Sequence, residues 1–422
     1  MTDPQAPTVE SGAGSRPETP SGSRPETPSG SMATRLRDRL PEGLADAAWL
    51  WLLLRVGMSL LAMLVVVEGR AAAPCPTDDH LRWLPGAGPA FPLLGAWHHW
   101  DACWYTTIAS NGYGTVEGTG STTFFPLLPW IAGTLAVVRD NIPWAFAVVN
   151  AVALIAALTG LHQLVARDVD APAARRTTRY LVVFPTAFFL VAPFTEALFL
   201  AGVVWAFLGA RTRRWEIVFV AGIVAGLARP LGLLLMLPLA WEAAMMVLDR
   251  WRAGGPRLRV GDIGVAIAVA APGIAYVGFI AWTSLVVGES YFEAHRGWGE
   301  HHLVLPWERL GEAVAYALDR ERPVQLFNAA VWVLFAGLTV AAIRLLPVAY
   351  WLFVLPQLVT ALTQETVWPL MSAGRYALAL FPCFVVLAIA GRNPRFHQAW
   401  LFISTLLLAY FATEFVRGTM VG

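Results

Sequence analysis

Long apolar runs dominate this chain and limit its fold more than any other feature. They recur from Ala47 to Phe415 and are separated by shorter segments that carry arginine. A helix needs about twenty mostly apolar residues to cross the hydrocarbon core of a bilayer, and several of these runs reach that length. Hydrophobic residues make up 57% of the chain and charged residues 14%, which excludes an ordinary soluble domain of this size. The sequence therefore predicts an all-α, polytopic membrane protein.

The arginines predict how these runs are oriented in the membrane. Arg35, Arg37 and Arg39 precede the first run, so we expect a cytoplasmic amino terminus. The apolar segment from Phe124 to Val138 resembles a second span, but counting it as one would place several later arginine clusters outside. We therefore predict a short, proline-interrupted juxtamembrane helix on the outer face. The arginines that then fall in the cytoplasm are Arg167, Arg175, Arg176, Arg179, Arg211, Arg213, Arg214, Arg250, Arg252, Arg257, Arg259, Arg344, Arg392 and Arg395.

The predicted fold is a bundle of about eleven transmembrane helices with its carboxyl terminus outside. The span pairs that meet near Pro193 and Pro230 are short for a full crossing, so we expect a locally open outer region there. Two large outer loops, at about 70–142 and 288–322, contain juxtamembrane helices and are expected to cover one cavity. The predicted spans are Ala47–Glu68, Pro143–Ala166, Tyr180–Pro193, Thr195–Ala210, Glu216–Ala228, Leu231–Leu248, Ile263–Val287, Pro323–Ile343, Val348–Leu362, Leu370–Ala390 and Trp400–Phe415.

The amino-terminal region differs in composition from the rest of the chain. Residues 1–33 are rich in Pro, Ser, Gly, Thr and Glu and contain the tandem copies Gly14–Ser21 and Gly22–Ser29. Such a segment buries no core, so we predict a disordered cytoplasmic tail followed by a transmembrane domain over residues 34–422. The basic residues are scattered along the chain, and no nucleic-acid partner is implied.

The stretch from Trp97 to Tyr105 places an acid among three tryptophans at the membrane surface. If this stretch is one helix, residues three and four apart share a face. Tryptophans prefer the headgroup level, so the neighbouring face would hold Asp101 where a lipid-linked substrate presents its head. The two faces are Trp97, Trp100 and Trp104, and His98, Asp101 and Tyr105. Asp101 is thus either a catalytic carboxylate or a solvated loop acid.

Three ionisable residues lie at or within the predicted spans, where a charge is costly and points to function. They are Glu196, Arg229 and Arg375, all near the outer face in the predicted topology. Two arginines that face one cavity suit a phosphate, because a guanidinium offers a bidentate fork that stays charged. The alternatives are that Glu196 and Arg229 pair with each other, or that Arg229 reaches to the surface.

The remaining polar residues are weaker candidates for a metal site or a substrate contact. Asp78, Asp79 and His80 resemble half of a metal site, but no further ligand has a suitable spacing, so no metal is predicted. His301 and His302 are candidate substrate contacts, although paired histidines in a loop are usually surface residues. The sequence contains no nucleotide-binding or zinc-protease motif, and no cofactor is predicted.

Cys75 and Cys103 are the two cysteines that the predicted topology places outside, where oxidation is permitted. A bridge between them would fix the Trp-Asp helix to the start of the first outer loop. On the chain-entropy model, closing a loop of about thirty residues stabilises by roughly 3 to 4 kcal/mol. The alternative is that Cys103 packs on the helix and Cys75 is a free thiol.

Several short motifs occur in an order that resembles a known family. The motifs are Trp100–Tyr105 with Ile108-Ala109 and Gly112-Tyr113, Phe124–Pro129, Phe184–Phe189, Pro193–Phe199, Gly226–Leu233, and Arg375-Tyr376 before Phe381-Pro382. In combination they resemble the PIG-V-type mannosyltransferases, which add the second mannose in GPI-anchor synthesis and have bacterial relatives. That family belongs to the GT-C superfamily of membrane glycosyltransferases.

The resemblance implies an inverting mannosyltransferase that uses a polyprenyl-phosphate-mannose donor on the extracytoplasmic side of the cell membrane. It assigns Asp101 as the base and extends a catalytic role to Glu196. Substrate binding falls to Trp100, Tyr105, Arg229, Arg375 and Tyr376, with His301 and His302 as the loop candidates. The acceptor would be a lipid-linked or cell-envelope glycan. A lipid or lipid-linked sugar transporter, which also needs broken helices and buried charges, is the alternative from another class.

Overall fold

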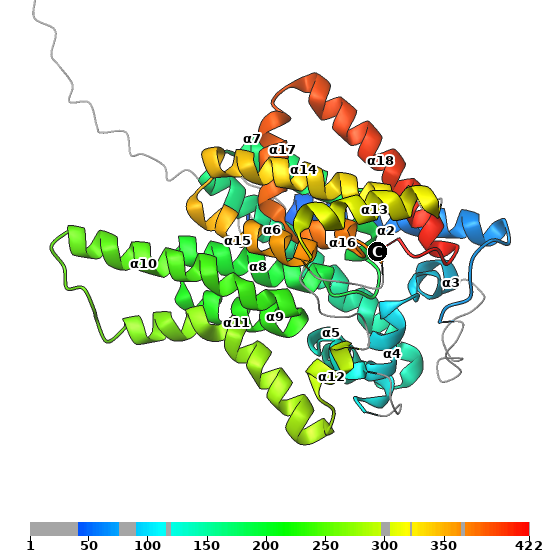
Figure 1. The fold of residues 1–422 in the computed structure, drawn as a ribbon, viewed down its shortest axis with the longest axis horizontal. Coiled ribbons are helices and arrows are strands. Elements are labelled where there is room, and N and C mark those ends of the chain that lie inside the picture. The colour runs from blue at the N-terminus through cyan, green and yellow to red at the C-terminus, as the bar shows by residue number, and fades with distance from the viewer. Residues whose placement is uncertain are drawn as a thin grey trace, which may run out of the picture. The chain divides into compact units, whose positions relative to one another are not determined.

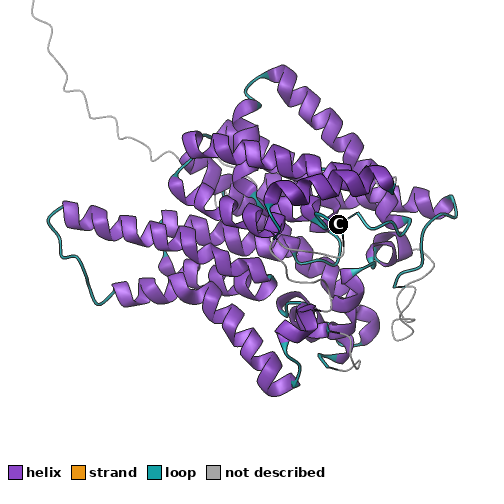
Figure 2. Ribbon diagram, in the orientation of Figure 1, coloured by secondary structure: helices purple, strands orange, loops and turns teal. Residues whose placement is uncertain are grey.

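The part of the chain that the computed structural model describes consists of helices joined by loops and turns, and no strand occurs there (Figure 2). The described residues are 41–75, 90–114, 120–296, 304–320, 323–363 and 368–421. The all-α prediction is confirmed. The tandem repeats, the half metal site at residues 78–80, and the loop histidines His301 and His302 lie outside the described residues.

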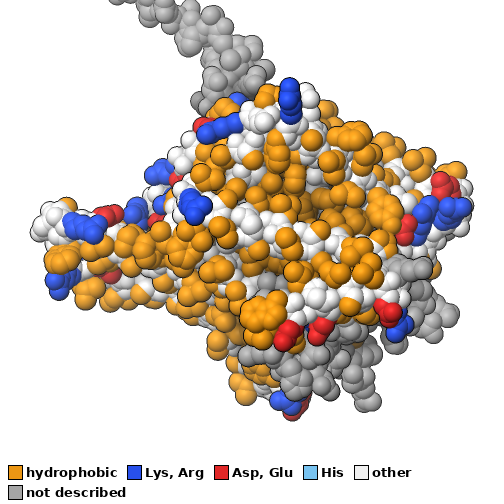
Figure 3. Space-filling view, turned by 45° about the horizontal axis from the view of Figure 1, so that its top comes forward, with side chains coloured by type: hydrophobic (Ala, Val, Ile, Leu, Met, Phe, Trp, Pro, Cys, Tyr) orange, Lys and Arg blue, Asp and Glu red, His pale blue; other side chains and the backbone are white. Residues whose placement is uncertain are grey.

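Six helical segments in the described part are long and apolar enough to cross a membrane, by length and composition. The bent pair formed by Ala373–Ala379 and α17 (Phe381–Ala390) would make a seventh. Figure 3 shows the matching surface, with hydrophobic side chains spread over one face and charged side chains gathered at its margins. The six segments are α2 (Leu44–Val67), Arg139–Asp168 with α6 (Ile142–Asp168), Pro230–Arg252 with α10 (Met236–Arg252), Asp262–Val287 with α11 (Asp262–Trp282), α14 (Pro323–Leu345) and α18 (Pro394–Val416).

Most of the other predicted spans are shorter helices, and one is not a helix. Helices α8 (Glu196–Arg211), α9 (Trp215–Ala228) and α15 (Val348–Thr363) occupy predicted spans but have 16, 14 and 16 residues. The prediction of a span over Tyr180–Pro193 is wrong. Helix α7 (Ala171–Val182) ends early, and a separate 3₁₀ turn, η5 (Ala187–Leu190), follows. Pro185 explains the break, because a proline disfavours the helical conformation in the residue before it.

Helix α8 is buried on nearly all sides and lies between α6 and α9 (Figure 1). Its sequence is apolar around its whole circumference, as expected for a helix enclosed by other helices. Gly202 permits the close approach of α9, since a Cβ there would lie 2.8 Å from the backbone nitrogen of Ala225. The tight turn between α8 and α9 makes them antiparallel. The start of α8 and the end of α9 therefore lie at the same end of the bundle.

The two predicted outer loops contain short helices and contact each other. The segment from Phe124 to Val138 holds only the nine-residue helix α5 (Leu127–Leu135), in agreement with a short juxtamembrane helix. The second loop includes α12 (Tyr291–Arg296) and α13 (Pro306–Asp319). Ser121 Oγ donates to Glu289 over 3.4 Å, and the ring of Phe125 meets that of Tyr291 edge to face. These contacts join the two loops.

The helix predicted from Trp97 to Tyr105 is not continuous. A 3₁₀ turn, η2 (Gly95–Trp97), comes first, and α4 (Asp101–Asn111) begins only after Trp100, whose φ is +57°. Trp97 is buried against Phe415 rather than seated at the membrane surface, so the predicted tryptophan face does not form. At this break the carbonyl of His98 accepts from the amide of Cys75, which lies outside both helical segments.

Candidate active site

Four charged side chains from distant parts of the chain meet at one point. Arg375 lies between the two acids, with Nη1 2.5 Å from Asp101 Oδ2 and Nε 2.5 Å from Glu196 Oε1. Arg229 Nη1 lies 3.1 Å from the same oxygen of Glu196. We call these four residues the charged quartet. Its two acids balance its two arginines, so the quartet as a whole carries no net charge.

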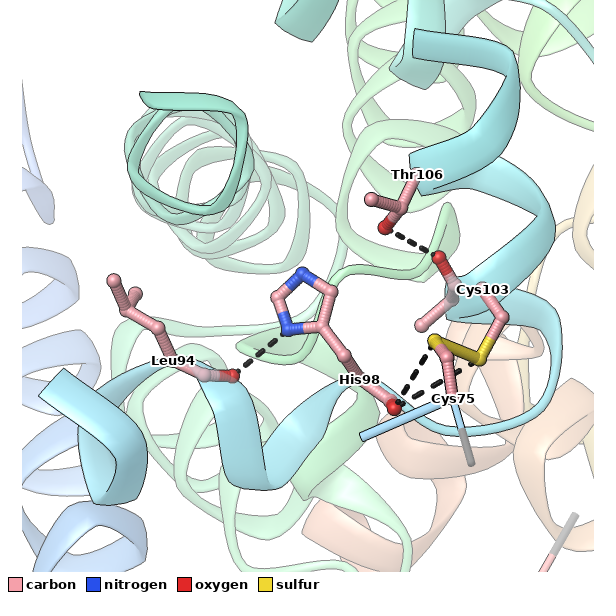
Figure 4. The surroundings of a disulfide bond; sticks show 6 residues. Cys75, Leu94, His98, Cys103 and Thr106 are labelled. Atoms are coloured by element: carbon pink, nitrogen blue, oxygen red, sulfur yellow. Dashed lines mark hydrogen bonds between the residues drawn. A yellow bond between two sulfur atoms is a disulfide. The ribbon is translucent and has the colours of Figure 1, made fainter. Parts of the chain in front are cut away.

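The local fold of the first outer loop holds Asp101 in place. Asp101 is the first residue of α4, where the amino-terminal end of the helix dipole stabilises a negative charge. A disulfide joins Cys75 to Cys103, with their Cα atoms 5.6 Å apart, and Cys103 lies in the first turn of α4 (Figure 4). The amide of Cys75 also donates to the carbonyl of His98 over 3.0 Å. The start of α4 is therefore tied covalently to the entry of the loop.

Glu196 and Arg229 are placed by the α8–α9 hairpin. Glu196 opens α8, and its side chain is 1% exposed. Arg229 follows α9 in an extended conformation, because Pro230 disfavours continuation of the helix. The Arg229 guanidinium carbon lies 4.8 Å from the ring centre of Tyr376, a cation–π arrangement. This places Tyr376, a predicted substrate-binding residue, beside the quartet.

Arg375 lies in the short helix α16 (Ala373–Tyr376), which is anchored at Gly374. The amide of Gly374 donates to Asn328 Oδ1 over 2.9 Å, and its carbonyl accepts from Thr186 Oγ1 over 2.7 Å. A Cβ at Gly374 would lie 2.6 Å from the ring of Phe327, so no larger residue fits without displacement. These contacts set the position from which Arg375 reaches both acids.

Asp101 is the most accessible member of the quartet. Its side chain is 22% exposed, against 1% for Glu196 and 7% for each arginine. Both arginines bond Glu196 through Oε1, and Glu196 Oε2 is buried with no hydrogen-bond partner among the described residues. Asp101 is therefore the acid of the quartet that is open to solvent, whereas Glu196 is enclosed.

The two aromatic residues predicted to bind substrate in the first loop differ in exposure. Trp100 is 43% exposed next to Asp101, whereas Tyr105 is buried with its ring edge-on to Phe124. Burial raises the pKa of the Tyr105 hydroxyl above its ordinary value, and the neighbouring Asp101 charge raises it further, so this hydroxyl stays protonated. Of these two side chains, only that of Trp100 is exposed.

The alternative in which Glu196 pairs with Arg229 is observed, and Arg375 pairs with both acids as well. Arg55, a charged residue inside the apolar helix α2, was not predicted as a functional residue, although an ionisable group in a span is the same signal that selected the arginines of the quartet. Within the described part of the chain, no three His, Cys, Asp or Glu side chains come together as a metal-binding group.

Comparison with known proteins gives weak likenesses in structure and none in sequence. No protein-family model matches this chain, and no curated protein matches it. It is similar to ArnT from Cupriavidus metallidurans bound to undecaprenyl phosphate, with 14% identity, a TM-score of 0.48, and coverage of 83% of this chain and 62% of ArnT. It is also similar to the Archaeoglobus fulgidus oligosaccharyltransferase in complex with Zn and sulfate, with 13% identity, a TM-score of 0.40, and coverage of 90% and 53%. The chain spans less than two thirds of either structure.

Proposed function

We propose that this protein is an inverting membrane glycosyltransferase. It moves mannose from a polyprenyl-phosphate-mannose donor to a lipid-linked or cell-envelope glycan acceptor on the outer face of the membrane. The observation that carries the proposal is the charged quartet, in which one accessible carboxylate lies beside two arginines. A displacement at a sugar carbon with a phosphate leaving group needs these parts, a base for the acceptor hydroxyl and cations for the departing charge.

In this proposal Asp101 takes the proton of the acceptor hydroxyl as its oxygen attacks the anomeric carbon of mannose. The bond from that carbon to the phosphate oxygen breaks, and its electron pair leaves with the lipid phosphate. Attack from the face opposite the leaving group inverts the anomeric configuration. Trp100 contacts the substrate at the entrance, and His301 and His302 remain loop candidates for the same role.

Arg229 and Arg375 hold the donor phosphate in this mechanism. A guanidinium has five N–H donors. The ion pairs within the quartet use one N–H of Arg229 and two of Arg375, which leaves donors for a phosphate. Glu196 keeps the two guanidinium groups together, and the Tyr376 ring orients Arg229.

The direct test is transfer of labelled mannose by the purified protein in lipid nanodiscs. The reaction would contain polyprenyl-phosphate-[¹⁴C]mannose and a total membrane lipid extract, with products separated by chromatography and the anomeric configuration determined by NMR. Asp101→Asn keeps the shape of the side chain and should lower turnover by about 100-fold or more, while donor binding is retained. Asp140→Asn changes an exposed acid of the same outer loop and serves as the matched control.

Three results would contradict the proposal. They are turnover of Asp101→Asn within a few-fold of the parent, a product with the configuration of the donor, and movement of the labelled donor across vesicles without any mannosylated product. The last result would favour the transporter alternative.

A further inference from the structure

Arg55 is a charged residue in the middle of the apolar helix α2, outside the charged quartet. Its helix is one of the six candidate spans, and the side chain is half-buried. None of the acidic groups in the described part of the chain forms an ion pair with it. A cation in such surroundings is costly unless its donors are used, so its hydrogen bonds indicate what it does.

The guanidinium of Arg55 holds two separate segments of the chain through their backbone. Nη1 donates to the carbonyl of Val191 over 3.0 Å, and Nη2 donates to the carbonyl of Leu93. The planar fork of an arginine carries these donors at a set separation, which an ammonium group does not offer. A single side chain of α2 therefore fixes the distance between the two carbonyls.

Both segments lead directly to an acid of the quartet. Leu93 ends α3 (Ala90–Leu93), and the chain passes through the turn η2 to Asp101 at the start of α4. Val191 precedes the turn that ends at Glu196, the first residue of α8. Because each path is short, a shift of either carbonyl moves the acid that follows it.

A second side chain secures the turn before Glu196 but does not touch the loop before Asp101. Asn150 of α6 donates through Nδ2 to the carbonyl of Ala192 and, over 3.2 Å, to that of Phe194. Asn150 thus holds one segment to the bundle, whereas Arg55 joins the two segments to each other. This difference separates the two residues in an experiment.

The side chain of Arg55 lies beside several nonpolar residues. The guanidinium lies in a pocket whose other walls include Trp97, Phe146 and Pro193. The bond to the Val191 carbonyl is partly buried, whereas the bond to the Leu93 carbonyl is exposed, and both carbonyls lose this donor when the guanidinium is removed. Removal of the guanidinium should therefore loosen both segments.

We propose that Arg55 is a positioning residue that sets the spacing between Asp101 and Glu196. It does not touch the reacting groups, and it acts by clamping the segments that carry the two acids. This role rests on the proposed function, since the spacing of the acids matters for glycosyl transfer.

The test combines hydrogen–deuterium exchange with steady-state kinetics on the full-length protein in nanodiscs. Arg55→Leu should raise amide exchange in both segments, around Leu93–Asp101 and around Val191–Glu196, and lower kcat roughly 10- to 100-fold with KM within about 3-fold, as small displacements of reacting groups do. Asn150→Ala should raise exchange only around Val191–Glu196. Arg55→Lys should recover part of kcat, because an ammonium group reaches one carbonyl at a time.

Ser59→Ala is the control from the next turn of α2 and should leave both readouts at the parent values. Unchanged exchange in either segment of Arg55→Leu, or a parental kcat with raised exchange in both, would overturn the clamp. If Arg55→Leu does not fold, Arg55→Lys is the variant that tests the positioning role. Parental values of both kcat and amide exchange in Arg55→Lys would then overturn that role. Absence of mannose transfer by the parent would refute the proposed function, whereas the exchange comparison would still report on the clamp itself.

Discussion

Because Arg375 bonds both acids of the quartet, its replacement should lower the stability of the protein. Arg375→Met removes the cation that bonds both acids and leaves the Glu196 side chain, 1% exposed, with Arg229 as its one ionic partner among the described residues. Removal of one member of a buried ion pair costs about 3 to 5 kcal/mol when the remaining charge has no other partner, and the cost is lower here because Arg229 still pairs with Glu196. The Asp101 contact adds less, since that carboxylate is 22% exposed and water solvates it once it is freed. We therefore expect a loss of about 2 to 3 kcal/mol in the free energy of unfolding, less than for a charge left with no partner.

A second substitution should deepen the loss of stability. Glu196→Gln in the Arg375→Met background removes the one acidic partner that Arg229 has among the described residues, so a buried cation is left uncompensated and stability should fall further. The double variant still has one arginine fewer for the donor phosphate, and it should stay inactive. Stability would be measured by reversible titration with SDS in mixed micelles, and activity by the mannose-transfer assay.

An exposed ion pair provides the control for this prediction. Arg392 and Asp170 lie 2.8 Å apart, but their side chains are 59% and 34% exposed, so Arg392→Met should cost less than about 1 kcal/mol. If Arg375→Met cost no more than Arg392→Met, or if Glu196→Gln restored stability in the double variant, the quartet would not be a balanced, buried charge cluster.

Three further predictions concern the outer loops. Reduction of the Cys75–Cys103 bond, verified by alkylation and mass spectrometry, should lower the free energy of unfolding by roughly 3 kcal/mol on the chain-entropy model; an unchanged SDS midpoint would contradict this. Burial lowers the pKa of His98 and His99 to about 4, below the roughly 6.5 of the unfolded chain. The unfolded state therefore binds more protons between these values, and stability should fall as the pH drops from about 6.5 to 4, an effect that His98→Phe should reduce. A cysteine at Asp140 should react with an impermeant reagent from outside intact cells, and labelling only after permeabilisation would mean that Phe124 to Val138 crosses the membrane.

The errors in the sequence interpretation have identifiable physical causes. The helix through Trp97 was predicted from spacing alone, but the helix is interrupted at Trp100, whose φ is +57°, and the His98 carbonyl is bonded to Cys75 there. The span at Tyr180–Pro193 was predicted from hydropathy, which does not register that Pro185 interrupts helical bonding. In both places the residues have the composition expected of a helix, but the helix is interrupted partway along the segment.

The sequence by itself determined that the chain is a helical membrane protein and which ionisable residues stand out. Apolar runs of about twenty residues are stable in few settings other than a bilayer, and charges within or beside such runs are costly enough to attract attention. Glu196, Arg229 and Arg375 could be selected on this ground, because the cost of a buried charge depends on its own immediate sequence surroundings.

Only the tertiary structure decided which of these groups meet. The ion pairs of Arg375 with Asp101 and with Glu196 join residues 274 and 179 positions apart, and the Arg55 bond to Val191 spans 136 positions. No local periodicity encodes such pairings, since they depend on how α8, α9 and α16 pack and on where the disulfide places α4. Whether an arginine is free for a phosphate or already paired with a carboxylate is therefore a property of the packed bundle, because the free energy of a buried charge depends on the partners that packing brings to it.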